Sequence, residues 1–417
     1  MNDLARRDFL RGAAGGLAGL ALVPELDRLF PVLPPGAPLR TALVGCGKRG
    51  KEILAELAKI DGVELAAICD RDPGKLKSGG RRAKEAARYA SVEELLAGES
   101  ELQAVLVATS TDQHRPVAEA ALAAGKHVWC EAPLANTIED ARALAAAGAA
   151  AAAAGRVFAA GFTARTNPVY GRARSVYKAG GVRSLVAARG AWFHKESWRA
   201  VAPTDERQRL LDWRVDPARC AGLPGECASH AIDALLWFTK ETPTRVAGHG
   251  AILLHDDGRE VADTVWLDLA LAKGRRMSFE GSIANSFEGD NLVLRGTHGT
   301  IKLAQTHAWL FKEADAVTMG WEVYAHRQPF HRDEGIVLLA NATQLADQGK
   351  LEEGAGLPNP PLYYSLHDFA AAVLEGTAPA CGAAEALPPT VLGILADQAV
   401  RRGEELAVEP ALLGLEG

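Results

Sequence analysis

The chain has 417 residues and a mass of 44.1 kDa, which exceeds the size at which one hydrophobic core usually stops growing, so two domains are expected. Apolar residues make up 48% and charged residues 24%, a balance that excludes a globally disordered protein. The formal net charge is −6, so no basic surplus exists to neutralise phosphate backbones. Nucleic acid is therefore not an expected partner.

Residues 1–38 are predicted to be an export signal and a linker. Arg6 and Arg7 form a twin-arginine pair, and a Gly/Ala/Leu stretch at residues 12–23 follows it. This order is typical of export by twin-arginine translocation (Tat), and the apolar stretch is shorter than a membrane span of about 20 residues. We expect a periplasmic or otherwise exported protein that meets the Tat machinery. The alternative is the frayed first helix of a cytoplasmic dehydrogenase.

A glycine-rich loop between a strand and a helix opens the first domain. An apolar run at residues 39–44 leads into Gly45-Cys46-Gly47-Lys48-Arg49-Gly50, and a helical pattern follows at residues 51–60. Gly-x-Gly-x-x-Gly in this context is typical of dinucleotide binding. The glycines allow a tight turn and let a pyrophosphate approach the helix N-terminus.

The next predicted strand, residues 63–69, ends at Asp70, twenty residues beyond Gly50. A carboxylate there binds both ribose hydroxyls and repels a 2′-phosphate, which favours NAD over NADP. The adjacent Arg71 can soften that preference.

Strand–helix alternation continues to residue 162. Predicted strands at 103–109, 126–130 and 157–161 alternate with predicted helices at 114–124 and 137–154. Repeated units of this length indicate a doubly wound parallel sheet, so residues 39–162 are predicted to form an α/β Rossmann domain. Ligands bind at the carboxyl ends of such strands. The residues expected beside the cofactor there are Thr109, Ser110, His114, Glu131 and Pro133.

The pattern changes to α+β in residues 163–417, the predicted substrate and oligomerisation domain. Predicted strands follow one another with short turns, which indicates an open-faced, mostly antiparallel sheet: 182–193, 245–254, 261–271, 275–283, 291–295 and 300–303. Flanking helices are predicted at 167–179, 226–239, 362–375 and 384–402, with the C-terminal ones partly returning to the first domain. Residues 319–361 have no clear period, which is typical of an active-site or oligomer-contact loop.

Four motifs stand in a specific order along the chain. They are the glycine-rich loop, Ala108-Thr109-Ser110 with His114, the segment 121–134, and Glu226-Cys227-Ala228-Ser229-His230-Ala231-Ile232-Asp233. Over about residues 39–405 they resemble the glucose-fructose oxidoreductase and inositol dehydrogenase (Gfo/Idh/MocA) family. The signal and the segments 192–198 and 212–214 resemble its exported branch. The resemblance implies bound nicotinamide cofactor, sugar or polyol substrates, and homodimers or homotetramers formed through the open sheet.

Only some of the family's catalytic residues are present at the matching positions of this sequence. The family's Glu-Lys-Pro triplet is Glu131-Ala132-Pro133 here, so the lysine that hydrogen-bonds the reacting hydroxyl is missing. The family's second motif, an acid followed four positions later by histidine, is Glu226 and His230. Residues four apart share a helix face, and His230 suits a general base. Lys195 is a candidate to replace the missing lysine, with a solvated surface lysine as the alternative.

Export and cofactor together constrain the expected reaction. Outside the cytoplasm there is no nicotinamide pool, so we expect tightly bound NAD that is regenerated in each turnover. The hydride would return to the same sugar after elimination or epimerisation, or pass to a second sugar. The alternatives are a catalytically impaired sugar- or nucleotide-binding protein, favoured by Ala132, and an NAD-dependent glycosidase or epimerase. No metal is expected, because Glu226 and His230 lack a third ligand.

Overall fold

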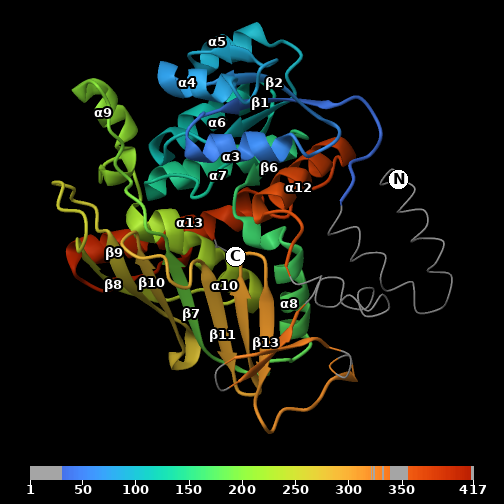
Figure 1. Cartoon of the computed structure of the whole chain (residues 1–417), viewed down its shortest axis with the longest axis vertical. Helices are drawn as coiled ribbons and strands as arrows, with labels where there is room; N and C mark the ends of the chain where they lie inside the picture. The colour runs from blue at the N-terminus through green and yellow to red at the C-terminus, as the bar shows by residue number, and fades with distance from the viewer. Residues whose placement is uncertain (1–30, 321, 323–324, 331–332, 339–355, 415–417) are drawn as a thin grey trace.

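The computed structural model of the chain describes residues 31–320, 322, 325–330, 333–338 and 356–414. Residues 1–30 of the predicted signal and linker (1–38) lie outside these residues, as does much of the segment expected to be an active-site or oligomer-contact loop. Two sheets form two stacked parts, and two long C-terminal helices run between them (Figure 1). Within the described residues, no helix combines the length and the apolar character needed to cross a membrane.

The first part is a six-stranded sheet in the order β3-β2-β1-β4-β5-β6. Its strands are β1 (Leu39–Val44), β2 (Val63–Cys69), β3 (Ala87–Tyr89), β4 (Ala104–Val107), β5 (His127–Cys130) and β6 (Phe158–Ala160). All neighbouring pairs are parallel, which confirms the predicted doubly wound sheet. The strand order reverses between β1 and β4, and ligands of such sheets bind at the carboxyl ends of the strands at that reversal.

Helices cover both faces of this sheet: α3 (Lys48–Leu57), α4 (Pro73–Gly80), α5 (Val92–Gly98), α6 (His114–Ala123) and α7 (Ile138–Ala153). The helix after the glycine-rich loop begins three residues earlier than expected, at Lys48 rather than residue 51. The unit of α4, β3 and α5 was not anticipated from the sequence.

The second part is a ten-stranded sheet in the order β14-β15-β13-β12-β11-β7-β10-β9-β8-β16. Its strands are β7 (Leu185–Phe193), β8 (Arg245–Ala251), β9 (Thr264–Ala270), β10 (Arg276–Ser282), β11 (Asn291–Gly296), β12 (Gly299–Ala304), β13 (Ala308–Lys312), β14 (Arg327–Pro329), β15 (Glu334–Val337) and β16 (Leu406–Ala407). Among the described strands of this sheet only β7 and β10 pair in parallel, so the mostly antiparallel prediction is confirmed. The segment expected to be wholly irregular contains β14 and β15, which is a correction.

The helices that follow the first sheet in the chain are α8 (Pro168–Lys178), α9 (Asp205–Leu211), α10 (Ser229–Thr239), α12 (Pro361–Glu375) and α13 (Ala383–Arg402). The helix predicted from residue 226 is interrupted, because Pro224–Ala228 form a wider π-helical turn before α10 begins. Gly225 packs there against α13, since a Cβ on Gly393 would lie 3.0 Å from its Cα. Such turns inside helices often mark functional sites.

Helix α12 returns to the first part and completes its hydrophobic core. Leu366 and Phe369 are buried in the same apolar cluster as Leu39 of β1. The indole Nε1 of Trp129 in β5 donates a hydrogen bond to Ser365 Oγ at 3.1 Å. The first part is therefore built from two distant stretches of the chain.

Candidate active site

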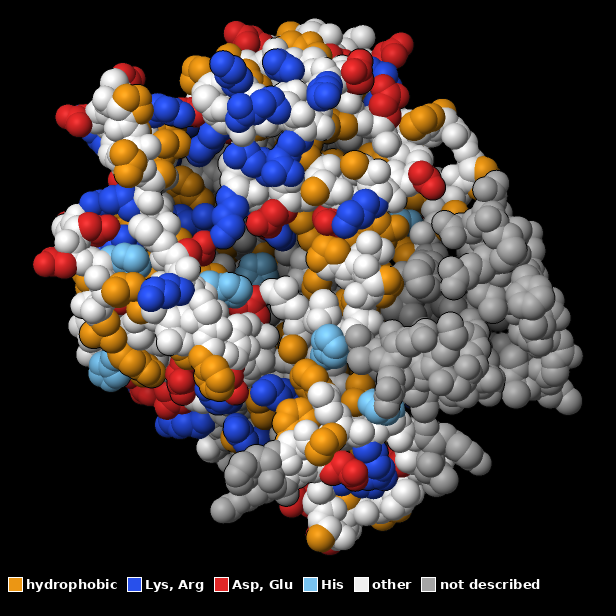
Figure 2. Space-filling view, viewed as in Figure 1, with side chains coloured by type: hydrophobic (Ala, Val, Ile, Leu, Met, Phe, Trp, Pro, Cys, Tyr) orange, Lys and Arg blue, Asp and Glu red, His pale blue; other side chains and the backbone are white. Residues whose placement is uncertain are grey.

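A cleft of about 940 Å³ lies where the two parts meet. Its walls come from the strand ends of the first sheet, from α10, and from β7 and β11 of the second sheet. Figure 2 shows Lys and Arg side chains gathered over the upper part of the molecule, with histidine side chains just below them. The cleft is the place where an anionic cofactor and a polar substrate can meet.

The glycine-rich loop fits a dinucleotide. Gly45 has a φ of +103°, and a Cβ on it would lie 2.2 Å from the Ala108 carbonyl oxygen. Gly50 approaches the loop equally closely, whereas a Cβ on Gly47 would meet open space. Helix α3 begins directly after Gly47 with no side-chain cap and no acid in its first turn. Its first amides are therefore free to bind an anion such as a pyrophosphate.

The carboxylate of Asp70 is held beside this loop. Its Oδ2 accepts a hydrogen bond from the Cys46 amide at 2.7 Å, and its Oδ1 accepts one from the Asp72 amide at 2.8 Å. The neighbouring Arg71 is exposed and does not line the cleft. The position of Asp70 at the end of β2 suits contact with a ribose.

Some of the predicted cofactor residues line the cleft and others do not. Those that line it are Lys48, Arg49, Thr109, His114 and Glu131. Those that do not line it are Gly45, Cys46, Gly47, Gly50, Asp70, Arg71, Ser110 and Pro133.

Glu131 is paired with an arginine rather than with the missing lysine. It is buried at the end of β5, where one carboxylate oxygen accepts a hydrogen bond from Arg49 Nε and the other accepts one from the Ala132 amide at 3.2 Å. Arg49 also contacts Glu52 at 3.0 Å. The methyl group of Ala132 lines the cleft and offers no donor to a substrate.

His114 supports the same segment from behind. Its ring Nδ1 lies 2.9 Å from the Pro133 carbonyl oxygen, and the side chain is buried. Burial lowers the pKa of this imidazole, so it stays neutral. We infer that His114 positions the 131–133 segment.

His230 projects into the cleft from α10. Its ring packs edge-on against Phe162, with 5.2 Å between the ring centroids. Burial lowers the pKa of His230, and Arg49 acts in the same direction against the opposing Glu131 and Asp290. The imidazole is therefore neutral near pH 7 and able to accept a proton.

Glu226 also lines the cleft, from the π-helical turn. Its Oε1 accepts hydrogen bonds from Thr111 Oγ1 at 2.8 Å and from the Ala221 amide at 3.2 Å. Burial raises the pKa of Glu226, although the Arg214 charge and the Thr111 hydroxyl oppose that shift. The Thr111 contact ties Glu226 to the first domain, and none of the hydrogen bonds found in the described residues joins it to His230.

Lys195 does not occupy the place expected of it. Its side chain is exposed and does not line the cleft, whereas His194 and Glu196 on either side do. The reason is local geometry, because successive residues of an extended chain point in opposite directions. The structure therefore does not bring Lys195 to the place of the missing lysine.

One further histidine of the cleft, His194, was missed from the sequence. His194 Nε2 bonds to Asp290 Oδ1 at 2.5 Å, and Asp290 Oδ2 accepts a hydrogen bond from Gln305. The Trp192 ring lies 4.5 Å from the His194 ring, between centroids. The Asp290 hydrogen bond raises the pKa of His194, so His194 and His230 have opposite pKa shifts. The alternation of Trp192 and His194 was the available signal.

Tyr170 of α8 lines the same cleft, although it stands far from His230 in sequence. Burial raises the pKa of its phenol. For metals, the described part of the chain holds no group of three or more His, Cys, Asp or Glu side chains suited to bind an ion.

Comparison with known proteins agrees with this architecture. A family model described as "Oxidoreductase family, NAD-binding Rossmann fold" matches residues 39–162, and the GFO/IDH/MocA C-terminal domain matches residues 172–302. A glycosyl hydrolase family 109 protein of Shewanella amazonensis is 28% identical over 162 residues, which are 34% of this chain and 36% of that protein. D-apiose dehydrogenase of Paraburkholderia graminis is 37% identical over 106 residues, 25% of this chain and 28% of the other.

The chain thus spans about a third of the length of the curated relatives it matches. Over nearly the whole chain, the structure is similar to aldose-aldose oxidoreductase from Caulobacter crescentus, solved in complex with glycerol. The TM-score is 0.66 at 21% identity, covering 89% of this chain and 100% of that one, which shows a shared fold. The two domain models lie in tandem and together cover more than half of the sequence, so the chain belongs to the Gfo/Idh/MocA oxidoreductase family.

Proposed function

We propose that the protein is an NAD-dependent oxidoreductase that acts on a hydroxyl of a sugar, polyol or glycoside. The observation that carries this proposal is the cleft itself, which joins the uncapped helix start of the glycine-rich loop to the neutral imidazole of His230. Sugar substrates are supported by the names of the relatives, which include an apiose dehydrogenase and an aldose-aldose oxidoreductase. Asp70 favours NAD over NADP because its charge repels a 2′-phosphate.

Bound at the glycine-rich loop, NAD would accept the hydride of the carbinol carbon. His230 takes the hydroxyl proton, since its lowered pKa keeps a nitrogen lone pair available. Glu226, fixed by Thr111, orients a substrate hydroxyl beside it. His194 is held by Asp290 through Nε2, and in its protonated form, which the raised pKa favours, Nδ1 donates a hydrogen bond to another sugar oxygen. The Trp192 ring offers an apolar face to the sugar.

Ala132 leaves the proton transfer to His230, without the lysine of the family pattern. Arg49 is the cation closest to Glu131, but its guanidinium is engaged by Glu131 and Glu52. The missing lysine also supports an alternative, a catalytically impaired binding protein. Such a protein would bind nucleotide or sugar without hydride transfer.

We further propose that the cofactor stays bound and is regenerated in each turnover. The twin arginines Arg6 and Arg7 support export through Tat to the periplasm, where no cofactor pool exists. Similarity to a protein named a glycosyl hydrolase supports a net reaction without redox change. A glycosidase or epimerase is therefore the second candidate, and Tyr170 in the cleft is the additional acid–base group that favours it.

A homodimer or homotetramer through the open face of the second sheet is also proposed. Val186 of β7 is 52% exposed and Trp266 of β9 is 44% exposed. Large apolar side chains on an uncovered sheet face suit contact with a second copy.

The deciding experiment measures nucleotide content. The folded protein is purified without added cofactor and denatured, and the released nucleotide is identified by mass spectrometry. Near-stoichiometric NAD is the expected result. The protein is then given a panel of aldoses, polyols and methyl glycosides, and reduction of the bound nucleotide is followed by absorbance. A protein that is empty and also fails to bind added NAD would overturn the proposal.

A further inference from the structure

Residues 196–219, here called the clamp segment, reach from the second part to the first, and three ion pairs join the segment to it. Glu196 Oε2 pairs with Lys48 Nζ at 2.6 Å. Arg207 pairs with Asp72, and Arg219 pairs with Asp112 at 3.3 Å. Figure 1 shows α9, within this segment, standing away from the second sheet and rising beside α4.

The three partners share one position in the fold. Lys48 follows β1, Asp72 follows β2 and Asp112 follows β4, so each stands just beyond the carboxyl end of its strand. In a doubly wound sheet these three ends surround a bound dinucleotide. The three ion pairs of the clamp segment therefore lie around the proposed dinucleotide site. One is at the glycine-rich loop, one is at the end of β2 near Asp70, and one is at the end of β4.

The contact between Arg207 and Asp72 is the strongest of the three. Arg207 Nε and Nη2 donate to the two carboxylate oxygens of Asp72 at 2.6 and 3.1 Å. Asp72 is only 1% exposed and also caps α4 by accepting a hydrogen bond from the Lys75 amide at 2.7 Å. A bidentate pair on a buried carboxylate is stronger than a surface ion pair. The Arg207 hydrogen bonds lower the pKa of Asp72, which keeps it ionised.

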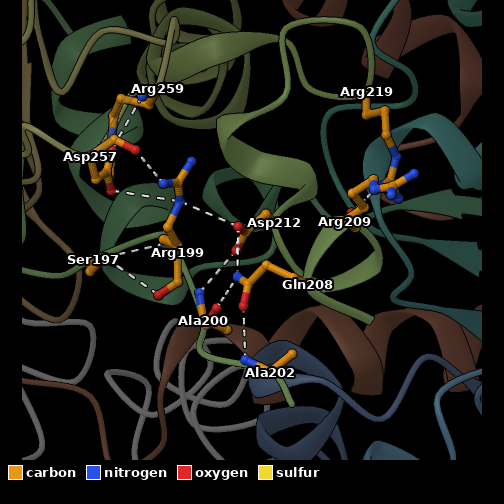
Figure 3. A network of polar contacts seen from close by, with 10 residues as sticks. All are labelled: Ser197, Arg199, Ala200, Ala202, Gln208, Arg209, Asp212, Arg219, Asp257 and Arg259. Carbon is orange, nitrogen blue, oxygen red and sulfur yellow. Dashed lines mark hydrogen bonds and ion pairs between the residues drawn. The ribbon is translucent and has the colours of Figure 1, made fainter. Parts of the chain in front are cut away.

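The clamp segment is stiffened by polar contacts of its own (Figure 3). Arg199 bonds to the Asp257 carbonyl oxygen and approaches Asp212 Oδ2 at 3.3 Å. Gln208 donates to Asp212 Oδ2 at 2.7 Å and accepts from the Ala202 amide at 2.8 Å. Helix α9 has no buried residue, so its position depends on polar contacts rather than on an apolar core.

We propose that the clamp segment retains the bound dinucleotide through turnover, and that release requires Arg207 to separate from Asp72. The inference rests on the proposed function, because it takes the glycine-rich loop as the dinucleotide site. A cofactor regenerated in place has no need to leave between turnovers, so slow release carries no penalty in rate. The clamp gives that retention a structural cause in this chain.

The test compares release rates of NADH from wild type, Arg207→Gln and Arg209→Gln. Arg209 is an exposed residue of the same helix, so its substitution is the matched control. Each protein is loaded with NADH and mixed with excess NAD, and the loss of bound-nucleotide fluorescence is followed. We expect release about tenfold faster in Arg207→Gln and unchanged in Arg209→Gln. Asp72→Asn, which keeps a capping side chain, should add little to Arg207→Gln because both remove one contact.

Two further measurements separate the clamp from a folding defect. Thermal unfolding of Arg207→Gln should match the control, while hydrogen exchange at residues 199–212 should accelerate. If Arg207→Gln does not fold, Arg219→Gln replaces it and is expected to release NADH faster than the control. Tight NADH binding with equal release rates in all variants would overturn the clamp alone. Absence of any nucleotide binding by wild type would overturn the proposed function and the clamp with it.

Discussion

Asp290 accepts a hydrogen bond from His194 at 2.5 Å across 96 positions of sequence. Gln305 donates to the other carboxylate oxygen, and Trp192 packs beside the imidazole. The second sheet thus presents to the cleft a histidine whose orientation and ionisation are set by its neighbours.

Replacing Asp290 by Asn should lower the pKa of His194 toward its ordinary value, because the hydrogen bond to Asp290 is the main cause of the raised pKa. The pKa of His230 should fall less, since Asp290 acts on it only through its charge. Histidine NMR titrations of wild type and Asp290→Asn measure both shifts. Asp268→Asn, an exposed carboxylate paired with Arg276, is the control and should change neither. An unchanged His194 titration would contradict the pairing.

Substitution of His230 by Gln should slow hydride transfer by about 100-fold or more, because it removes the general base. In wild type the reactive form is the neutral imidazole. Its pKa is lowered by burial, so the acid limb of the rate profile should have its midpoint below about 6.5. Reduction of bound NAD in a single turnover, measured across pH, checks both statements. His249→Gln, an exposed histidine of β8, serves as the control, and an unchanged rate in His230→Gln would place the base elsewhere.

The buried pair of Arg165 and Asp233 should dominate local stability beneath the site. Arg165 Nη2 lies 2.7 Å from Asp233 Oδ1, with side-chain exposures of 9% and 0%. Asp233→Ala leaves a buried guanidinium unpaired and should lower the free energy of unfolding by about 3 kcal/mol. Urea unfolding at neutral pH measures this loss. A loss no larger than that of an exposed pair would contradict it.

The carboxyl group of Asp233 also makes the free energy of unfolding depend on pH. Burial raises the pKa of Asp233 to about 6, above its value of about 3.9 in an unfolded chain. The folded state then binds this proton more tightly, so the contribution of Asp233 to stability falls as pH rises through about 4 to 6. Asp233→Asn should remove that slope, and the difference between the two unfolding curves across pH reports it.

Asp70→Ala should weaken NAD binding and reduce the preference for NAD over NADP by about tenfold, because it removes the charge that repels a 2′-phosphate. It also leaves the Cys46 amide without its carboxylate partner. Calorimetric titration with both nucleotides measures the two affinities. Glu85→Ala, an exposed acid between α4 and β3, should leave the ratio unchanged. An unaltered ratio in Asp70→Ala would assign the preference to other residues.

Replacing Arg6 and Arg7 together by Lys should abolish export, because the Tat route reads the arginine pair. Fractionation of cells expressing each form locates the folded protein. Arg11→Lys, which leaves the pair intact, is the matched control and should still be exported. Periplasmic protein from the double variant would exclude the twin-arginine route.

Local patterns were sufficient for the glycine-rich loop and for five of the six strands of the first sheet, because each signal lies within a few residues. The glycine spacing predicted the turn after β1, and apolar runs predicted β1, β2 and β5. The unit of α4, β3 and α5 was missed because Pro73–Gly80 has three glycines and little apolar periodicity. Strands β14 and β15 are too short to show alternation.

The site was harder to predict where it depends on distant contacts. The π-helical turn under Glu226 depends on Gly225 meeting α13, which no local pattern reports. The partners of His194 and Glu226 are Asp290 and Thr111, each separated from its partner by roughly a hundred positions. Lys195 is the opposite case. Its residue type suits the chemistry, but its exposed side chain does not line the cleft.

Because α12 packs on the first part, the cofactor domain can be exchanged between relatives only together with this helix. A recombination that exchanged only residues 39–162 between relatives would separate Trp129 from Ser365 and uncover the apolar surface around Leu39. Helix α12 lies outside both matched family segments, yet it supplies part of that core. A viable chimaera must therefore carry residues 361–375 together with the cofactor domain, so the two stretches are expected to evolve as one.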